Sequence, residues 1–372
     1  MPSSRLSRLG RVALPTVFSL LIGGVSAPSL AATAPNATSS AQTVMDAMAK
    51  ANAAVVGVRV KAVEGARSAL TLGLRRSGSG VVIGSDGLIL TIGYLMLEAE
   101  QIEVITQEGK TVPAVAVGYD LATGFGLVRP LLPLRGVSAV ALGSQQSLTA
   151  GEPLMAATGV GSGNGGGNGD GGVSLTRLVS QRAFSGTWEY HLDNALFTSP
   201  PVSSSGGNHS GAPLFNGKGE LVGIGSLFVS DALGPVAGSP GGSAVPNRSP
   251  GNMFVPIDLL KPILLEMQQI GTSKQSNRAW LGVTSSDQGG RIQVMRVADG
   301  SPAQDAGLKP GSVVQAINGV EVTTLEAFYK KLWANTSPEQ PVKLTVREGT
   351  EVKTIDITPQ NRMLSLKKPA GI

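Results

Sequence analysis

The chain has 372 residues, of which 50 are glycine, 15% are charged and none is cysteine. This length allows two domains with appended segments, and so many glycines with so few charges indicate a turn-rich β protein. The lack of cysteine excludes a disulfide framework, thiolate chemistry and a lipid-modified cysteine anchor, and it is compatible with an oxidising compartment.

The formal net charge of +5 comes from the two ends of the chain. Six cationic residues lie there: Arg5, Arg8, Arg11, Arg362, Lys367 and Lys368. Without these six positive charges the rest of the chain has a net charge near −1. We therefore expect no basic surface for nucleic acid.

The first 31 residues have the order of a secretory signal peptide. Three arginines precede an apolar run over residues 12–25, and small residues follow as far as Ala31. This order predicts cleavage near Ala32 and export to the periplasm of a Gram-negative bacterium. The run is short for a membrane span, so an uncleaved anchor is the alternative and no span is expected after signal removal.

Residues 32–44 form a predicted polar linker, and the chain then reads as short strands. Alternating or continuous apolar residues predict strands at 53–60, 88–91, 102–106, 111–117, 154–157 and 173–180. Two stretches rich in glycine, 159–172 and 230–252, are predicted loops. A phosphate-cradling loop is the alternative for the first, but no helix with Lys-Ser or Lys-Thr follows it.

A change of period marks the next segment. From residue 259, apolar residues at helical spacing predict an amphipathic helix whose buried face includes Ile270 and which ends at Gly271. Beyond residue 279, the sequence predicts strands at 292–297, 342–347 and 351–357, and an Asn-Gly hairpin at 317–320. Thr323 and Glu326 have the spacing of a capping box at the start of a second helix.

Three motifs carry chemistry. The first is Ser77-Gly78-Ser79-Gly80, which runs on through Asp86-Gly87 to Thr91-Ile92-Gly93-Tyr94; the second is Asp120-Leu121-Ala122-Thr123-Gly124; the third is Gly207-Asn208-His209-Ser210-Gly211. A serine in a glycine-rich turn before an apolar strand is the way trypsin-type enzymes present a nucleophile. The glycines let main-chain N–H groups converge on a developing oxyanion.

In this order the motifs resemble the HtrA/Deg family of serine proteases with a PDZ domain, over residues 45–360. The resemblance implies a mainly β fold, with a trypsin-like double β-barrel at 45–271 and an α+β PDZ domain at 279–360. Residues 272–278 would be the linker between them, and 361–372 a tail.

The resemblance also assigns the catalytic positions. Ser210 stands at the nucleophile position, and the main-chain N–H groups of Asn208 and Ser210 stand at the oxyanion hole. Tyr94 replaces the catalytic histidine and Gly124 replaces the aspartate that orients it. Asn208 occupies a position that the family fills with glycine.

These replacements remove the general base. A serine hydroxyl is a poor nucleophile unless a neighbouring group accepts its proton. Tyrosine ordinarily titrates near pH 10, so Tyr94 is not expected to act as a base at neutral pH, and Gly124 has no side chain. The chain has only two histidines: His209 should diverge from Ser210, and His191 lies in a predicted strand away from the site.

The PDZ resemblance places a carboxylate-binding loop at Trp280, Leu281, Gly282 and Val283. In such loops, main-chain N–H groups capture the C-terminus of a peptide that adds a strand to the domain. A purely structural packing module is the alternative.

We therefore predict an exported pseudoprotease that binds unfolded polypeptides or peptide C-termini in envelope protein quality control. The alternative is an active periplasmic endopeptidase that uses Ser210. No metal site or cofactor is expected, because the chain has no cysteines and no clustered histidines. The sequence leaves a homo-oligomer open.

Overall fold

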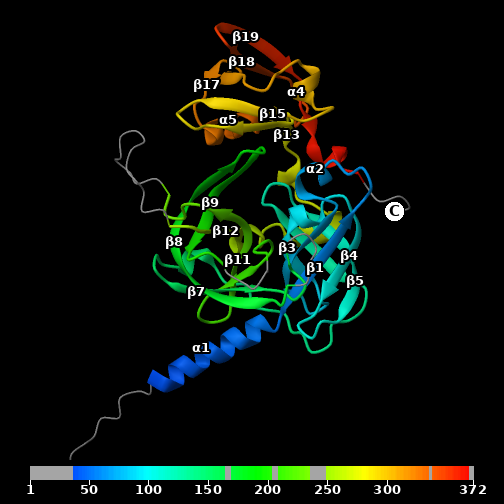
Figure 1. Ribbon diagram of the computed structural model, residues 1–372, viewed down its shortest axis with the longest axis vertical. Coiled ribbons are helices and arrows are strands. Elements are labelled where there is room, and N and C mark those ends of the chain that lie inside the picture. The colour runs from blue at the N-terminus through cyan, green and yellow to red at the C-terminus, as the bar shows by residue number, and fades with distance from the viewer. Residues whose placement is uncertain (1–36, 164–168, 203–207, 235–248, 335–336, 368–372) are drawn as a thin grey trace, which may run out of the picture.

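The computed structural model describes residues 37–163, 169–202, 208–234, 249–334 and 337–367. Two closed barrels lie side by side, and a separate α+β domain lies above them (Figure 1). This arrangement confirms the predicted mainly β fold. No helix in these residues is long and apolar enough to span a membrane.

The first barrel closes in the strand order β1-β2-β3-β6-β5-β4, with every neighbouring pair antiparallel. Its strands are β1 (Val55–Ala62), β2 (Arg75–Val82), β3 (Ile89–Ile92), β4 (Ala99–Ile105), β5 (Thr111–Tyr119) and β6 (Phe125–Pro130). The strands predicted in this region are all present, with boundaries that differ by a few residues. β3 is buried along its whole length, and its one polar residue, Thr91, donates its hydroxyl to the Ser79 carbonyl oxygen (2.7 Å).

The second barrel closes in the order β10-β11-β12-β9-β8-β7. Its strands are β7 (Pro153–Thr158), β8 (Gly172–Gly186), β9 (Tyr190–Ser199), β10 (Pro213–Phe215), β11 (Leu221–Val229) and β12 (Gly251–Pro256). β8 is seven residues longer than the predicted strand at 173–180 because it continues past the barrel with β9 as a hairpin. Within the predicted glycine-rich loops 159–172 and 230–252, residues 164–168 and 235–248 fall outside the described residues.

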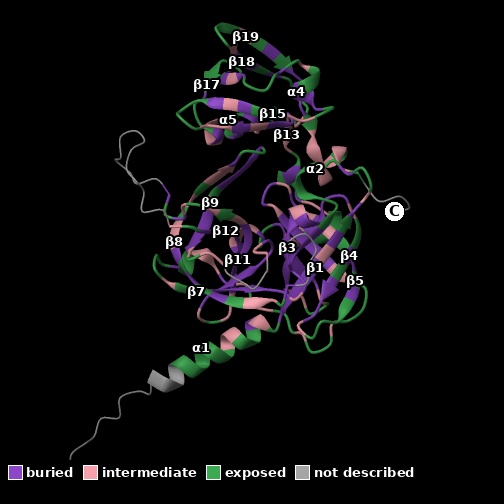
Figure 2. Ribbon diagram, viewed as in Figure 1, coloured by how far each residue is buried: buried purple, intermediate pink, exposed green. Residues whose placement is uncertain are grey.

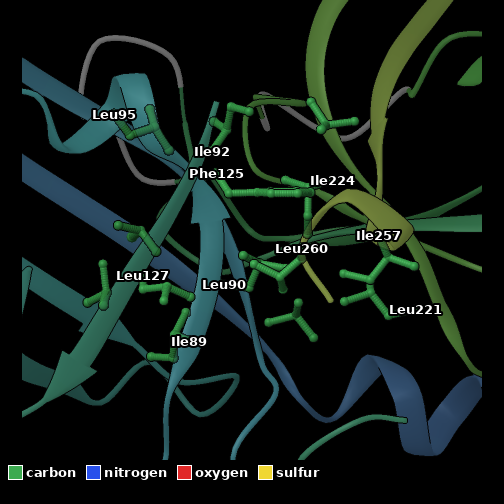
Figure 3. Packing of buried hydrophobic residues seen from close by; sticks show 14 of the residues in the cluster. Ile89, Leu90, Ile92, Leu95, Phe125, Leu127, Leu221, Ile224, Ile257 and Leu260 are labelled. Carbon is green, nitrogen blue, oxygen red and sulfur yellow. The ribbon is translucent and has the colours of Figure 1, made fainter. Parts of the chain in front are cut away.

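A buried apolar core joins the two barrels. Figure 3 shows Leu90 and Phe125 of the first barrel packed near Ile224 of the second, with Ile257 and Leu260 from the turn that follows β12. All five side chains are essentially inaccessible to solvent. Because this core crosses the boundary between the barrels, the loops that meet there are held on a rigid base.

The first helix was not predicted, because residues 32–44 were expected to form a polar linker. Residues 37–52 form α1 (Ala37–Asn52), which projects from the barrels with most of its described surface exposed (Figure 2). A four-residue helix, α2 (Ala69–Leu72), follows β1, and 3-10 turns occur at η1 (Gly93–Met96), η2 (Gln145–Ser147), η4 (Ile257–Leu259) and η5 (Lys274–Ser276).

The helix predicted from residue 259 is shorter than expected. α3 spans Leu264–Ile270, because Pro262 has no N–H and interrupts the regular helix before residue 263. Gly271 ends it in the left-handed conformation, as predicted. The prediction that Ile270 lies on the buried face was wrong: its side chain is 62% exposed.

The C-terminal domain contains a sheet in the order β14-β15-β16-β18-β19, with β17 paired to β16. Its elements are β14 (Val283–Ser286), β15 (Ile292–Val297), α4 (Pro302–Asp305), β16 (Val313–Ile317), β17 (Val320–Glu321), α5 (Leu325–Leu332), β18 (Val342–Glu348) and β19 (Glu351–Ile357). The Asn-Gly hairpin is confirmed, with Asn318 and Gly319 both at positive φ. The capping-box prediction was wrong, because Thr324 and not Thr323 is the N-cap of α5.

The predicted tail is structured as far as residue 367. β20 (Gln360–Asn361) pairs with β13 (Ala279–Trp280), and η6 (Arg362–Ser365) follows. The Lys367 N–H then donates to the carboxylate of Glu98 in the first barrel (3.0 Å). The C-terminal segment therefore connects the α+β domain back to the barrels.

Candidate functional site

The residues assigned to the catalytic positions meet in two turns between the barrels. Tyr94 lies in η1, directly after β3, and Ser210 lies in the loop that leads into β10. The Ser79 N–H donates to the Ser210 carbonyl oxygen (2.8 Å), which fastens the Ser210 loop to β2 of the first barrel. The fold therefore brings together residues 116 positions apart in the sequence.

The Ser210 side chain is held between a tyrosine and an asparagine. The Tyr94 hydroxyl lies 2.7 Å from Ser210 Oγ and 2.8 Å from the Ser226 carbonyl oxygen. Ser210 Oγ donates to Asn208 Oδ1 (2.7 Å). The proton of the serine hydroxyl thus points at a neutral amide oxygen, and the second neighbour is a phenol whose single proton is shared between Ser210 Oγ and the Ser226 carbonyl oxygen.

Tyr94 stays protonated at neutral pH in this environment. Burial raises the pKa of Tyr94 to about 12, although its hydrogen bond with Ser210 acts in the opposite direction. A phenol with this pKa cannot accept the serine proton near pH 7. It can orient Ser210 and satisfy the Ser226 carbonyl.

An aspartate at position 124 would have a strained backbone and a tight contact with a neighbouring side chain. Its φ is +83°, and a Cβ there would lie 3.2 Å from the Tyr190 hydroxyl. That hydroxyl donates to the Thr123 carbonyl oxygen (2.6 Å), so it is fixed in place. The Gly124 carbonyl oxygen accepts from Gly93 N (2.7 Å), which places Gly124 beside the turn that carries Tyr94.

Both N–H groups expected to form the oxyanion hole have partners within the protein. The Ser210 N–H donates to Asn208 Oδ1 (2.9 Å), and the Asn208 N–H donates to the Ser162 carbonyl oxygen (3.0 Å). Asn208 Nδ2 in turn donates to the Ser77 carbonyl oxygen (3.2 Å). A substrate carbonyl would have to break these hydrogen bonds before it could be polarised here.

Neither histidine supplies the missing base. Among the described residues, no hydrogen bond joins Ser210 to His209 or His191. Burial lowers the pKa of His209, whose ring is near the Ser226 backbone. His191 Nδ1 lies 2.9 Å from Ser185 Oγ, and its Nε2 lies 3.3 Å from Asp193 Oδ1.

One group of potential metal ligands was not foreseen from the sequence. The ligand atoms of His191, Asp193 and Glu326 lie within 4.8 Å of one another. Lys330 Nζ, however, lies 2.7 Å from both Asp193 Oδ1 and Glu326 Oε1. A lysine ammonium therefore already bridges the two carboxylates and offsets part of their charge, and the arrangement is an ion-pair cluster between the second barrel and α5.

The predicted carboxylate-binding loop lies at the start of the C-terminal domain. Leu281 and Val283 are buried, and Gly282 has a φ of +86°. A Cβ at position 282 would lie 2.3 Å from the Ser301 side chain, so only glycine fits there. This bend directs the three N–H groups of residues 281–283 toward one point.

The point at which these N–H groups converge is the carboxylate of Glu189, in the turn of the β8–β9 hairpin. Leu281 N lies 2.8 Å from Oε1, and Gly282 N and Val283 N lie 3.0 and 3.4 Å from Oε2. The role of Glu189 was not predicted from the sequence, because nothing in its local sequence indicates a hydrogen-bond partner more than 90 residues away.

Comparison with known families matches each part of this architecture. Residues 78–224 match the trypsin-like peptidase domain, and residues 279–358 match the PDZ domain. The chain is 27% identical over 289 residues to a probable periplasmic serine endoprotease DegP-like from Hahella chejuensis. That match covers 74% of this chain and 55% of the relative, so the chain spans about half of that protein's length.

Another relative matches over a larger share of its length. The chain is 27% identical over 278 residues to the serine endoprotease DegS of Haemophilus influenzae, covering 72% of each chain. Among solved structures, the HtrA-type protease AlgW with a serine-to-alanine substitution and a bound tripeptide has a TM-score of 0.50 at 20% identity. The structural similarity covers 88% of this chain and 98% of the AlgW chain, and at this identity it shows a shared fold alone.

Proposed function

Because the chain belongs to the HtrA family of trypsin-like proteins with a PDZ domain, we propose that it is a proteolytically inactive member that binds polypeptides. Its ligands would be unfolded segments or peptide C-termini of other proteins.

One observation carries the proposed inactivity: the Ser210 hydroxyl donates its proton to the Asn208 side-chain oxygen. A neutral amide oxygen does not take up a proton at neutral pH, so it cannot serve as general base during attack. Tyr94, the other neighbour of Oγ, is itself protonated because its pKa is about 12. Ser210 therefore has no group to which its proton can be transferred.

The engaged oxyanion donors support the same conclusion. Loss of one such donor in a serine protease costs about 10²–10³ in rate. Without the triad, an intact oxyanion hole and substrate binding leave roughly 10³–10⁴ over water. Here the N–H groups of both Asn208 and Ser210 are occupied, so even that residual rate enhancement is reduced.

The proposed location is the periplasm, where the protein would take part in envelope protein quality control. The basic, apolar and small-residue order of residues 1–31 supports export. Several relatives are named periplasmic serine endoproteases, which supports the same compartment. The PDZ domain is the part of the chain that fits polypeptide recognition.

A fluorophosphonate probe tests the proposed inactivity, because it labels only an activated serine. Wild type and Ser210→Ala are incubated with the probe alongside trypsin as a positive control. We expect wild type to label no faster than Ser210→Ala. Rapid labelling that disappears in Ser210→Ala would instead support the alternative, an active endopeptidase that uses Ser210.

A further inference from the structure

The β8–β9 hairpin of the second barrel extends beyond the barrel to the PDZ domain (Figure 1). The end of the hairpin, here called the hairpin tip, consists of Gly186, the last residue of β8, and the turn residues 187–189. The hairpin tip contacts the PDZ domain through its main chain and through a side-chain carboxylate. A bound peptide C-terminus uses the same two kinds of group.

The side-chain carboxylate is that of Glu189. Its two oxygens accept the N–H groups of Leu281, Gly282 and Val283, at 2.8, 3.0 and 3.4 Å. The residue is 7% exposed, and its φ of 58° is unusual for a residue with a side chain. The backbone is therefore held in a disfavoured conformation while the carboxylate occupies the loop.

The main-chain contacts involve the strand β14 and the helix α5. These two elements are the walls of the peptide groove expected of a PDZ domain, which ends at the carboxylate-binding loop. From β14, the Ser285 N–H donates to the Thr187 carbonyl oxygen (2.8 Å). From α5, the Tyr329 hydroxyl donates to the Gly186 carbonyl oxygen (2.8 Å). The Glu189 N–H donates to the oxygen of the same hydroxyl (3.2 Å). The strand, the helix and the carboxylate-binding loop thus all contact the hairpin tip.

We propose that the hairpin tip is an internal ligand of the PDZ groove, which closes the groove until a polypeptide C-terminus displaces it. This inference rests on the proposed peptide-binding function and adds its regulation. The displacing ligand would place its α-carboxylate on the N–H groups of residues 281–283 and pair its main chain with Ser285. The apparent affinity for such a ligand is lowered by the fraction of molecules in which the tip is docked.

The structure provides space beside this contact for an incoming chain. A cavity of about 610 Å³ lies between the domains and is lined in part by Trp188, Glu189, Trp280, Arg296 and Arg362. It is continuous with the carboxylate-binding loop, since Gly282 and Val283 also line it. A peptide terminus can therefore approach the loop before the hairpin tip has left it.

The test uses the full chain and two independent readouts. Hydrogen exchange measured by mass spectrometry reports whether the amides of Leu281, Gly282 and Ser285 are protected without any ligand. Fluorescence anisotropy reports the binding of labelled decapeptides that end in an apolar residue, with amidated decapeptides as the negative control. Glu189→Ala is the main variant.

Asp193→Ala is the matched control, because Asp193 is a carboxylate of the same hairpin that contacts Lys330 and not the loop. Tyr329→Phe is a second variant, which removes only the hydroxyl that holds the hairpin tip. We expect Glu189→Ala to lose amide protection and bind the free-carboxylate peptides about 10-fold or more tightly than wild type. Tyr329→Phe should change in the same direction, and Asp193→Ala should match wild type.

Three outcomes separate this inference from the proposed function. Equal peptide affinity in wild type and Glu189→Ala, with unchanged amide protection, would overturn the internal ligand and leave peptide binding in place. Loss of protection in Glu189→Ala without peptide binding in any variant would support the internal ligand and contradict the peptide-binding function. Equal loss of protection in Asp193→Ala would show that general interface packing, and not the carboxylate, closes the groove.

Discussion

The side chain of Asn208 fixes the conformation of the turn that carries Ser210. Its amide oxygen accepts from both the N–H and the hydroxyl of Ser210, and its amide nitrogen donates to the Ser77 carbonyl oxygen. Glycine at this position could make none of these hydrogen bonds. The sequence identifies Asn208 as a departure from the family pattern, but its side-chain contact with Ser77 joins a loop and a strand whose two residues are 131 positions apart.

A first prediction concerns Gly124, where restoring the aspartate should destabilise the protein. Gly124→Asp places a side chain at φ +83° and directs its Cβ toward the Tyr190 hydroxyl. We expect the free energy of unfolding in urea to fall by about 2–3 kcal/mol.

Gly109→Asp is the matched control, because Gly109 also has a positive φ but would have open space around its Cβ. We expect Gly109→Asp to lower the free energy of unfolding by only about 1 kcal/mol, because it strains the backbone without crowding a neighbour. Equal losses in the two variants would show that Tyr190 does not crowd this position.

At the level of single elements, alternation and turn residues were enough to predict about half of the strands that the described residues form, and β6 and β12 were not among them. The sheet of the PDZ domain follows the sequence closely: β15 and β19 have the predicted bounds. The sequence gives no comparable signal for the extension of β8 to Gly186, because the hairpin leaves the barrel and is stabilised by another domain. Its contacts with Ser285 and Tyr329 link residues about 100 or more positions apart, and no local pattern encodes them.

A second prediction concerns the start of α5. The Thr324 hydroxyl accepts from the Ala327 N–H (3.2 Å), so Thr324→Ala should lower the free energy of unfolding by about 1 kcal/mol. Thr323, which the capping-box pattern favours, is exposed. Thr323→Ala should therefore change stability by less than about 0.5 kcal/mol. Urea unfolding of both variants decides between the two caps, and the reverse order would restore the capping box.

A third prediction concerns the pH dependence of the hairpin contact. Burial raises the pKa of Glu189 from 4.5 to about 7, while its hydrogen bonds with the loop N–H groups and the charge of Arg362 oppose this shift. Because the pKa is higher in the docked state, docking is fully favourable below about pH 4.5 and weakens as the pH rises through 7. The change should be about 3 kcal/mol between pH 4.5 and 8, because each unit of pKa difference corresponds to about 1.4 kcal/mol.

Tryptophan emission measures this change, since all three tryptophans of the chain lie near the contact. Trp188 is in the hairpin tip, Trp280 lines the neighbouring cavity, and Trp333 stacks on Tyr329 at 5.3 Å. In Glu189→Gln the pH dependence should disappear, while His191 and Lys330 at the same interface remain. A pH profile that is the same in Glu189→Gln and wild type would assign the effect to those other groups.

At the scale of the whole molecule, the described residues connect the PDZ domain to the barrels at several points. These include the hairpin tip, the ion-pair cluster around Lys330, and the C-terminal segment that returns to Glu98. The ion pairs of Lys330 are exposed to solvent and contribute little individually, whereas the Glu189 contact is buried. Together with the hydrogen-bonded turn that carries Ser210, these contacts support the proposal that the protein binds polypeptides without cutting them.

The intact mass of an unfolded substrate tests that account most directly. Reduced casein is incubated for a day with wild type or with Ser210→Ala, and its mass is followed by mass spectrometry while co-elution on size exclusion reports binding. The account predicts that casein stays intact with both proteins and co-elutes with both to the same extent. Casein fragments that form with wild type and are absent with Ser210→Ala would contradict it.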